Sequence, residues 1–75
     1  MADIVQMQTF GQKLRDLRKS RNLSQSQLAK KLGVGLMSVS FWERDTVEPS
    51  IFNAIAVADF FNISLDELCC REFEK

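Results

Sequence analysis

Basic side chains gather in the first half of this 75-residue chain. Residues 10–44 contain eight Lys or Arg against two acids, a balance of about +6. Residues 45–75 contain two bases against seven acids, a balance of about −5, and Asp3 brings the formal net charge to zero. A surface of one sign attracts a partner of the opposite sign. The first half is therefore compatible with a polyanion such as a nucleic acid, which the net charge conceals.

The residue types that catalysis and metal binding require are missing from the sequence. It has no histidine, no glycine-rich phosphate loop and no nucleophile beside a recognisable base. Cys69 and Cys70 are adjacent, so a disulfide between them would be strained, and we interpret them as reduced thiols. A zinc site needs about four suitably spaced ligands, which this chain does not offer. We therefore expect no enzymatic activity, no metal, no cofactor and no small-molecule ligand.

Composition points to one globular domain in the cytoplasm. The chain is 45% hydrophobic and 27% charged, which is typical of a folded domain rather than a disordered tail. No apolar run approaches the ~20 residues that a membrane span needs. The first ten residues lack a basic leader and an apolar run of signal-peptide length. We expect an N-terminal arm at residues 1–9, a single domain at residues 10–75 and no membrane partner.

Capping residues and apolar spacing predict an all-α fold of five short helices. The form of a capping box recurs in three pairs, Thr9 with Gln12, Ser24 with Gln27, and Ser64 with Glu67. Ser50 is a further N-cap, and Asn22, Gly33 and Asn62 suit the left-handed turn that ends a helix. The predicted helices span residues 10–21, about eight residues between 24 and 33, residues 36–44, residues 51–61, and residues 65 to about 73.

The fourth predicted helix has more apolar residues than one stripe can hold. At helical spacing, its core-facing stripe is predicted to contain Ile51, Ala54, Ile55, Ala58 and Phe61. Phe52, Val57 and Phe60 then lie outside that stripe. They either widen the core or form a surface for another subunit.

Three segments carry a resemblance to a known family: "LSQSQLAKKLGV", "SVSFWERDTVEPS" and "ADFFNISLDEL". In this order and spacing they resemble the Xre/Cro family of phage-repressor-like helix-turn-helix regulators over residues 10–68. The resemblance implies a compact lambda-repressor-like bundle with its helix-turn-helix at about residues 24–44. It also implies a homodimeric transcriptional regulator, most often a repressor, that binds a palindromic operator in double-stranded DNA. The third helix would then lie in the major groove.

The resemblance also assigns roles to individual residues. Val39 and Trp42 match buried positions of the third helix. The phosphate contacts that it implies are Gln25, Ser38, Ser40 and Arg44. The residues placed near the bases or the groove are Gly35, Leu36, Met37 and Phe41. Arg18 and Glu43 match a pair that joins the first and third helices as a strut, although two separately solvated charges are the alternative.

The third helix departs from the family pattern. Leu36, Met37 and Phe41 stand where relatives usually carry polar residues that discriminate bases by hydrogen bonding. Three interpretations remain open: the apolar residues touch thymine methyl groups or sense groove shape, they bind another protein, or Leu36 and Met37 cap the core. Asp45 replaces a common glycine, and Glu48 adds a second acid near the expected DNA backbone. We therefore expect modest affinity and limited salt dependence.

Family members commonly pair through the last two helices. On this basis the predicted dimer interface contains Phe52, Phe60, Cys69 and Phe73. A two-fold dimer would place two recognition helices about one DNA turn apart.

Overall fold

The computed structural model describes residues 8–68, and these residues form five helices and no strand. The helices are α1 (Phe10–Ser20), α2 (Gln25–Leu32), α3 (Leu36–Glu43), α4 (Ile51–Phe61) and α5 (Leu65–Leu68). The all-α prediction is confirmed. Two helices end one residue earlier than predicted, because Arg21 and Arg44 are the C-caps of α1 and α3.

Side-chain caps begin the helices as the sequence predicts. Thr9 Oγ1 accepts the Gln12 backbone N–H at 3.1 Å, and the Gln12 side chain accepts the Thr9 N–H at 3.0 Å. Ser24 and Gln27 repeat this reciprocal arrangement at α2. Ser50 and Ser64 each accept one backbone N–H at the start of α4 and α5. These bonds satisfy donors that have no partner inside the helix.

Left-handed residues end four of the helices, with Asp45 after α3 and the other three after α1, α2 and α4. Asn22, Gly33 and Asn62 have φ values of 59°, 74° and 58°, the region that glycine and asparagine adopt at lowest cost. In each case the next residue turns back, and its N–H bonds a carbonyl of the preceding helix. The residues that follow, Leu23, Val34 and Ile63, are half-buried and pack on the core. The short turns therefore contribute apolar surface as well as a change of direction.

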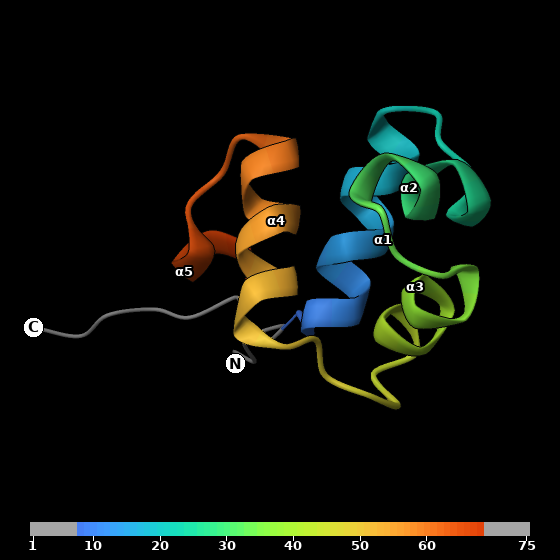
Figure 1. Cartoon of the computed structure of the whole chain (residues 1–75). Coiled ribbons are helices and arrows are strands. Elements are labelled where there is room, and N and C mark those ends of the chain that lie inside the picture. The colour runs from blue at the N-terminus through green and yellow to red at the C-terminus, as the bar shows by residue number, and fades with distance from the viewer. Residues whose placement is uncertain (1–7, 69–75) are drawn as a thin grey trace, which may run out of the picture.

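One hydrophobic core joins the helices. Figure 1 shows α2 and α3 on one side of α1, with α4 and α5 on the other. The buried cluster consists of Leu14, Leu28, Ala29, Val39, Trp42, Val57, Ala58, Phe61 and Leu68. Val39 and Trp42 are fully or almost fully buried, which confirms their predicted place. They hold the inner face of α3 against the bundle.

The predicted core stripe of α4 is partly wrong. Val57, which was expected outside the stripe, is fully buried, whereas Ile51 and Ile55 are 56% and 42% exposed. The buried face instead consists of Ala54, Val57, Ala58 and Phe61. Both sets follow helical spacing, and α4 is apolar on almost every side, so periodicity alone could not choose between them. Packing against the other helices decides the face.

Several expectations fall outside the described residues. Only Gln8 and Thr9 of the predicted N-terminal arm are described. Cys69, Cys70, Phe73 and the predicted continuation of the fifth helix to residue 73 also lie outside the described residues. Within residues 8–68, no helix is both long and apolar enough to cross a bilayer.

Candidate nucleic-acid interface

Two short helices and a tight turn form the centre of the candidate site. α2 ends at Leu32, and the chain turns through its C-cap Gly33 and Val34 to Gly35, the N-cap of α3. Gly35 supplies no side-chain hydrogen bond to the first turn of α3. The partial positive charge of that helix end is therefore not offset by a capping side chain, which favours a nearby phosphate.

The outer face of α3 is largely apolar and open to solvent. Leu36 and Met37 are 48% and 58% exposed, so neither caps the core as one of the three interpretations proposed. Phe41 is half-buried, as are Ser38 and Ser40, and Arg44 is exposed at the helix end. The fold thus places the predicted groove residues on the outer side of α3 and, for Gly35, at its N-cap.

Arg18 and Glu43 form a nearly buried ion pair between α1 and α3. Arg18 Nε and Nη2 donate to the two carboxylate oxygens of Glu43 at 2.6 and 3.0 Å, and Arg18 Nη1 donates to the Leu23 carbonyl at 2.8 Å. The two side chains are only 11% and 4% exposed. The hydrogen bond to Glu43 raises the pKa of Arg18 above its ordinary value, although burial opposes the shift. This geometry ties the end of α3 to α1, as a strut would.

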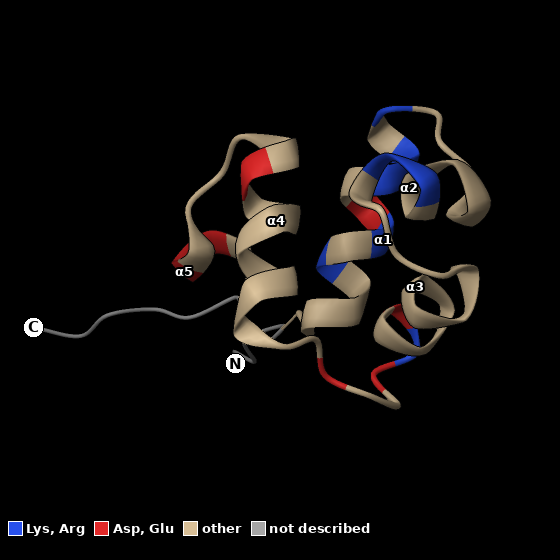
Figure 2. Ribbon diagram, in the orientation of Figure 1, with Lys and Arg blue, Asp and Glu red and all other residues tan. Residues whose placement is uncertain are grey.

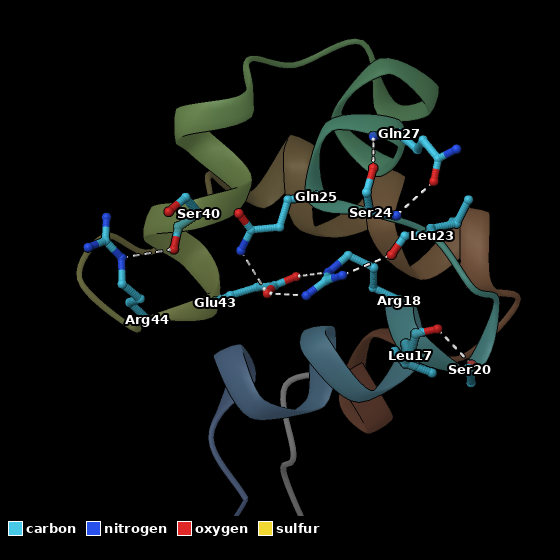
Figure 3. Close-up of polar contacts among 10 residues, drawn as sticks. All are labelled: Leu17, Arg18, Ser20, Leu23, Ser24, Gln25, Gln27, Ser40, Glu43 and Arg44. Carbon is cyan, nitrogen blue, oxygen red and sulfur yellow. Dashed lines mark hydrogen bonds and ion pairs between the residues drawn. The ribbon is translucent and has the colours of Figure 1, made fainter.

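Gln25 joins the same network from the first turn of α2. Its Nε2 donates to Glu43 Oε1 at 3.0 Å, so one carboxylate receives bonds from two other helices. Figure 3 shows the Gln25 side-chain nitrogen directed to Glu43 and its oxygen directed away. An amide nitrogen has two N–H donors, so one remains for a phosphate contact. Sequence patterns did not reveal this bond, because it depends on how α2 and α3 cross.

Asp45 makes a second link between α3 and α1 that sequence reasoning missed. Its Oδ1 accepts the Gly11 backbone N–H at 2.9 Å, and its Oδ2 accepts the Thr9 hydroxyl at 2.7 Å. Asp45 has a φ of 57°, which explains why glycine suits this position and why an aspartate costs little there. Its carboxylate also lies at the positive end of α1. Asp45, which replaces a glycine common in the family, is therefore stabilised by its bonds to Thr9 and Gly11.

Gly11 allows the two helices to come this close. A Cβ added at Gly11 would lie 2.5 Å from the Glu43 carbonyl oxygen and 2.6 Å from that of Trp42. Such distances are shorter than real contacts, and both atoms belong to the backbone. The end of α3 is thus fixed by a backbone contact as well as by Glu43 and Asp45.

Arg44 and Phe41 lie together at the C-terminal end of α3. The Arg44 guanidinium carbon is 5.2 Å from the centroid of the Phe41 ring, and Arg44 Nε donates to the Ser40 carbonyl at 3.4 Å. The structure therefore brings a predicted phosphate contact and a predicted groove contact into one cluster.

Here α3 follows α2 after a tight turn, exposes its outer face and is fixed to α1 at its C-terminal end. This arrangement defines a helix-turn-helix domain. A family model described as helix-turn-helix matches residues 14–68. The chain belongs to this family, of the Xre/Cro type that its sequence resembles.

Relatives with curated names are transcriptional regulators. The chain is 36% identical to the transcriptional activator BcrR of Enterococcus faecalis over 84% of this chain and 31% of that protein. It is 37% identical to the cryptic phage CTXphi repressor RstR of Vibrio cholerae over 80% of this chain and 54% of that protein. The chain thus spans about a third to a half of these relatives. Regulators of this family are not enzymes, in agreement with the sequence.

Solved structures show the same domain. The P22 c2 repressor in complex with a synthetic operator has a TM-score of 0.77 and 34% identity, covering 81% of this chain and 92% of that one. The restriction-modification controller protein C.AhdI of Aeromonas hydrophila has a TM-score of 0.74 and 35% identity, with coverages of 83% and 94%. The lambda-repressor-like fold expected from the sequence is therefore confirmed.

Proposed function

We propose that this protein is a sequence-specific DNA-binding transcriptional regulator that places α3 in the major groove. The observation that carries the proposal is the free outer face of α3, fixed at its end by the nearly buried pair of Arg18 and Glu43. A groove-binding helix needs both properties, because it must enter the DNA without losing its angle to the rest of the domain. The solved P22 c2 complex, in which the same fold is bound to an operator, supports it.

The residues divide into two kinds of proposed contact. The proposed phosphate contacts are Gln25, Ser38, Ser40 and Arg44. Each has a side-chain hydrogen-bond donor and lies on α3, at its end or on the neighbouring α2. Groove contacts come from Gly35, Leu36, Met37 and Phe41. Apolar side chains read DNA through thymine methyl groups or groove shape rather than by hydrogen bonding.

The charge distribution favours modest affinity. Figure 2 shows Lys and Arg concentrated on α1 and α2, whereas α3 itself has none between Leu36 and Glu43. Asp45 and Glu48 lie in the loop after α3, and acids near the DNA backbone oppose binding. Few cations lie where phosphates would approach, so the salt dependence should be shallow for a DNA-binding domain.

We further propose that the regulator is a homodimer on a palindromic operator. Phe52 is 80% exposed on α4, beside the exposed Ile51 and Ile55. Next to them, an open groove of about 540 Å³ is lined by Phe10, Asp45, Glu48, Pro49, Ile51 and Ala54. A projecting aromatic residue beside a partly apolar groove suits a two-fold interface, because the Phe52 of each copy can enter the groove of the other.

Phe60 contributes less to this surface than Phe52. It is half-buried, its ring meets Phe61 edge to face at 4.9 Å, and the Arg21 guanidinium lies over it at 5.5 Å. We keep Phe60 at the margin of the proposed interface. Repression is the proposed mode of regulation, since a dimer on an operator can block access to it, and the cytoplasm is the proposed location.

A second candidate function is a protein-interaction module with weak or no DNA binding. The exposure of Leu36 and Met37 beside Phe41 favours it, because clustered exposed apolar residues are typical of surfaces that a partner covers.

A salt-dependent fluorescence titration with DNA fragments from the region upstream of its own gene tests the two candidates. The regulator predicts saturable binding that weakens as salt rises, with a preferred fragment. Absence of saturable binding at low salt, with dimerisation confirmed by sedimentation, would favour the protein-interaction module.

A further inference from the structure

Phe41 and Arg44 lie one helical turn apart, and the Arg44 guanidinium lies over the Phe41 ring. The distance of 5.2 Å from the guanidinium carbon to the ring centroid is within the ~6 Å at which a cation is attracted to an aromatic face. Arg44 Nε also donates to the Ser40 carbonyl of the same helix. The ring and the carbonyl together restrict an exposed side chain that would otherwise sample many rotamers.

The terminal nitrogens of the Arg44 guanidinium are available to a ligand although the side chain is restricted. Among the described residues, the two terminal nitrogens of Arg44 make no hydrogen bond or ion pair. Figure 3 shows them directed away from the domain. Two terminal N–H groups in a planar fork match two oxygens of a phosphate. The cluster therefore presents a prepared anion contact beyond the end of α3.

The Phe41 ring has a different character in this arrangement. It is half-buried, and one face is occupied by the guanidinium. The face of a bare aromatic ring carries partial negative charge and would not attract a phosphate. With the Arg44 guanidinium over it, the ring attracts the cation and limits its movement.

We propose that Phe41 acts in DNA binding through Arg44, as the platform that positions its guanidinium for a backbone phosphate, rather than as a base reader. This inference rests on the proposed DNA-binding function. A pre-positioned side chain loses less conformational freedom on binding, so the platform raises affinity for every sequence alike. Sequence preference is left to Leu36 and Met37.

A double-mutant cycle on DNA affinity tests the coupling. Phe41→Leu keeps an apolar side chain without a ring, Phe41→Trp keeps a ring, and Arg44→Gln removes the cation. In the wild-type background, we expect Phe41→Leu to weaken binding about two- to five-fold on preferred and random DNA alike. Phe41→Trp should weaken binding less than Phe41→Leu does, because an indole ring still offers a face to the cation. With Arg44→Gln already present, Phe41→Leu should cause no further loss.

Three outcomes would overturn the inference. If Phe41→Leu weakens binding equally with and without Arg44, the ring acts independently of the cation. If its effect is confined to one DNA sequence, the ring reads bases. If wild-type protein shows no saturable binding, the proposed function fails and this inference with it. Thermal unfolding of each variant without DNA separates loss of fold from loss of contact, and Phe41→Trp provides a folded aromatic comparison.

Discussion

At the scale of residues, the carboxylate of Glu43 joins α3 to two other helices. It receives bonds from Arg18 on α1 and Gln25 on α2, and the backbone oxygen of Glu43 faces Gly11. With 4% of the side chain exposed, the Glu43 carboxylate has little access to water that could replace these partners. Removal of any partner should therefore affect the position of α3.

Replacing Arg18 by alanine should destabilise the fold by about 3 kcal/mol, because it leaves a buried carboxylate without its cation. Urea denaturation measures this free energy. Lys13→Ala is the matched control, since its pair with Glu67 is longer, at 3.7 Å, and more exposed; its effect should be below about 1 kcal/mol. If the double reversal, Arg18→Glu with Glu43→Arg, recovers none of the stability that the single reversals lose, the strut is contradicted.

The same pair should not respond to alkaline pH. Its hydrogen bond to Glu43 raises the pKa of Arg18 in the folded state. A raised pKa gives stability that is complete below the unfolded value and is lost only as the pH rises through the folded value. Both values lie far above neutrality, so the cost of Arg18→Ala should be equal at pH 7 and pH 9. A cost that shrinks at pH 9 would argue against this assignment.

Gly11→Ala should destabilise the domain by about 1–3 kcal/mol, because the added methyl group would meet two backbone carbonyls of α3. The control is Gly35→Ala, where a Cβ meets nothing within 4 Å and φ is −77°. Thermal unfolding of the two variants provides the comparison. Equal melting temperatures would contradict the close approach of α1 to α3.

At the scale of elements, α3 packs on the core with its inner face and leaves its outer face for the proposed DNA contact. Val39 and Trp42 fix the inner face, while Leu36 and Met37 remain free on the outer one. Gln25 approaches from α2, so one of the proposed phosphate contacts lies on a different helix from the proposed groove contacts Leu36 and Met37. Changes on the two should have different signatures.

Met37→Ala should alter the preference among operator sequences by roughly 1 kcal/mol, whereas Gln25→Ala should weaken binding to all sequences alike. Competition titrations with a panel of single-base operator variants measure both effects. Lys30→Ala, at the other end of α2, should leave preference and affinity unchanged. A uniform loss from Met37→Ala would remove it from the set of proposed readers.

At the scale of the whole molecule, α4 and α5 form a surface that is separate from the proposed DNA-binding face of α3. Most of α4 is uncharged, with Asp59 near its end and Asp66 and Glu67 on α5, as Figure 2 shows. The acidic end would keep DNA away from this side. The exposed Ile51, Phe52 and Ile55 remain available for a second copy.

Phe52→Lys should weaken self-association by roughly 30-fold, the effect of losing an interface residue worth about 2 kcal/mol. Sedimentation equilibrium without DNA measures the dissociation constant. Ser26→Lys, which adds the same charge on an exposed position of α2, is the control and should leave association unchanged. A dimer that tolerates Phe52→Lys would place the interface elsewhere.

Local features of the sequence determined the helices and their ends. Capping boxes, left-handed asparagines and Gly33 act within a few residues, so Thr9, Ser24 and Asn62 could be assigned directly. The spaced motifs predicted the helix-turn-helix, and the free outer face of α3 followed from the burial of Val39 and Trp42. These features depend on near neighbours in the chain.

Only the tertiary structure decided which face of α4 is buried and what Asp45 and Gln25 contact. Asp45 bonds residues 34 and 36 positions earlier in the chain, and Gln25 bonds a carboxylate 18 positions later. Such contacts depend on the crossing of helices, which residue spacing does not encode. The stripe of α4 depends on the same crossings, because two apolar faces fit its sequence and only one meets the core.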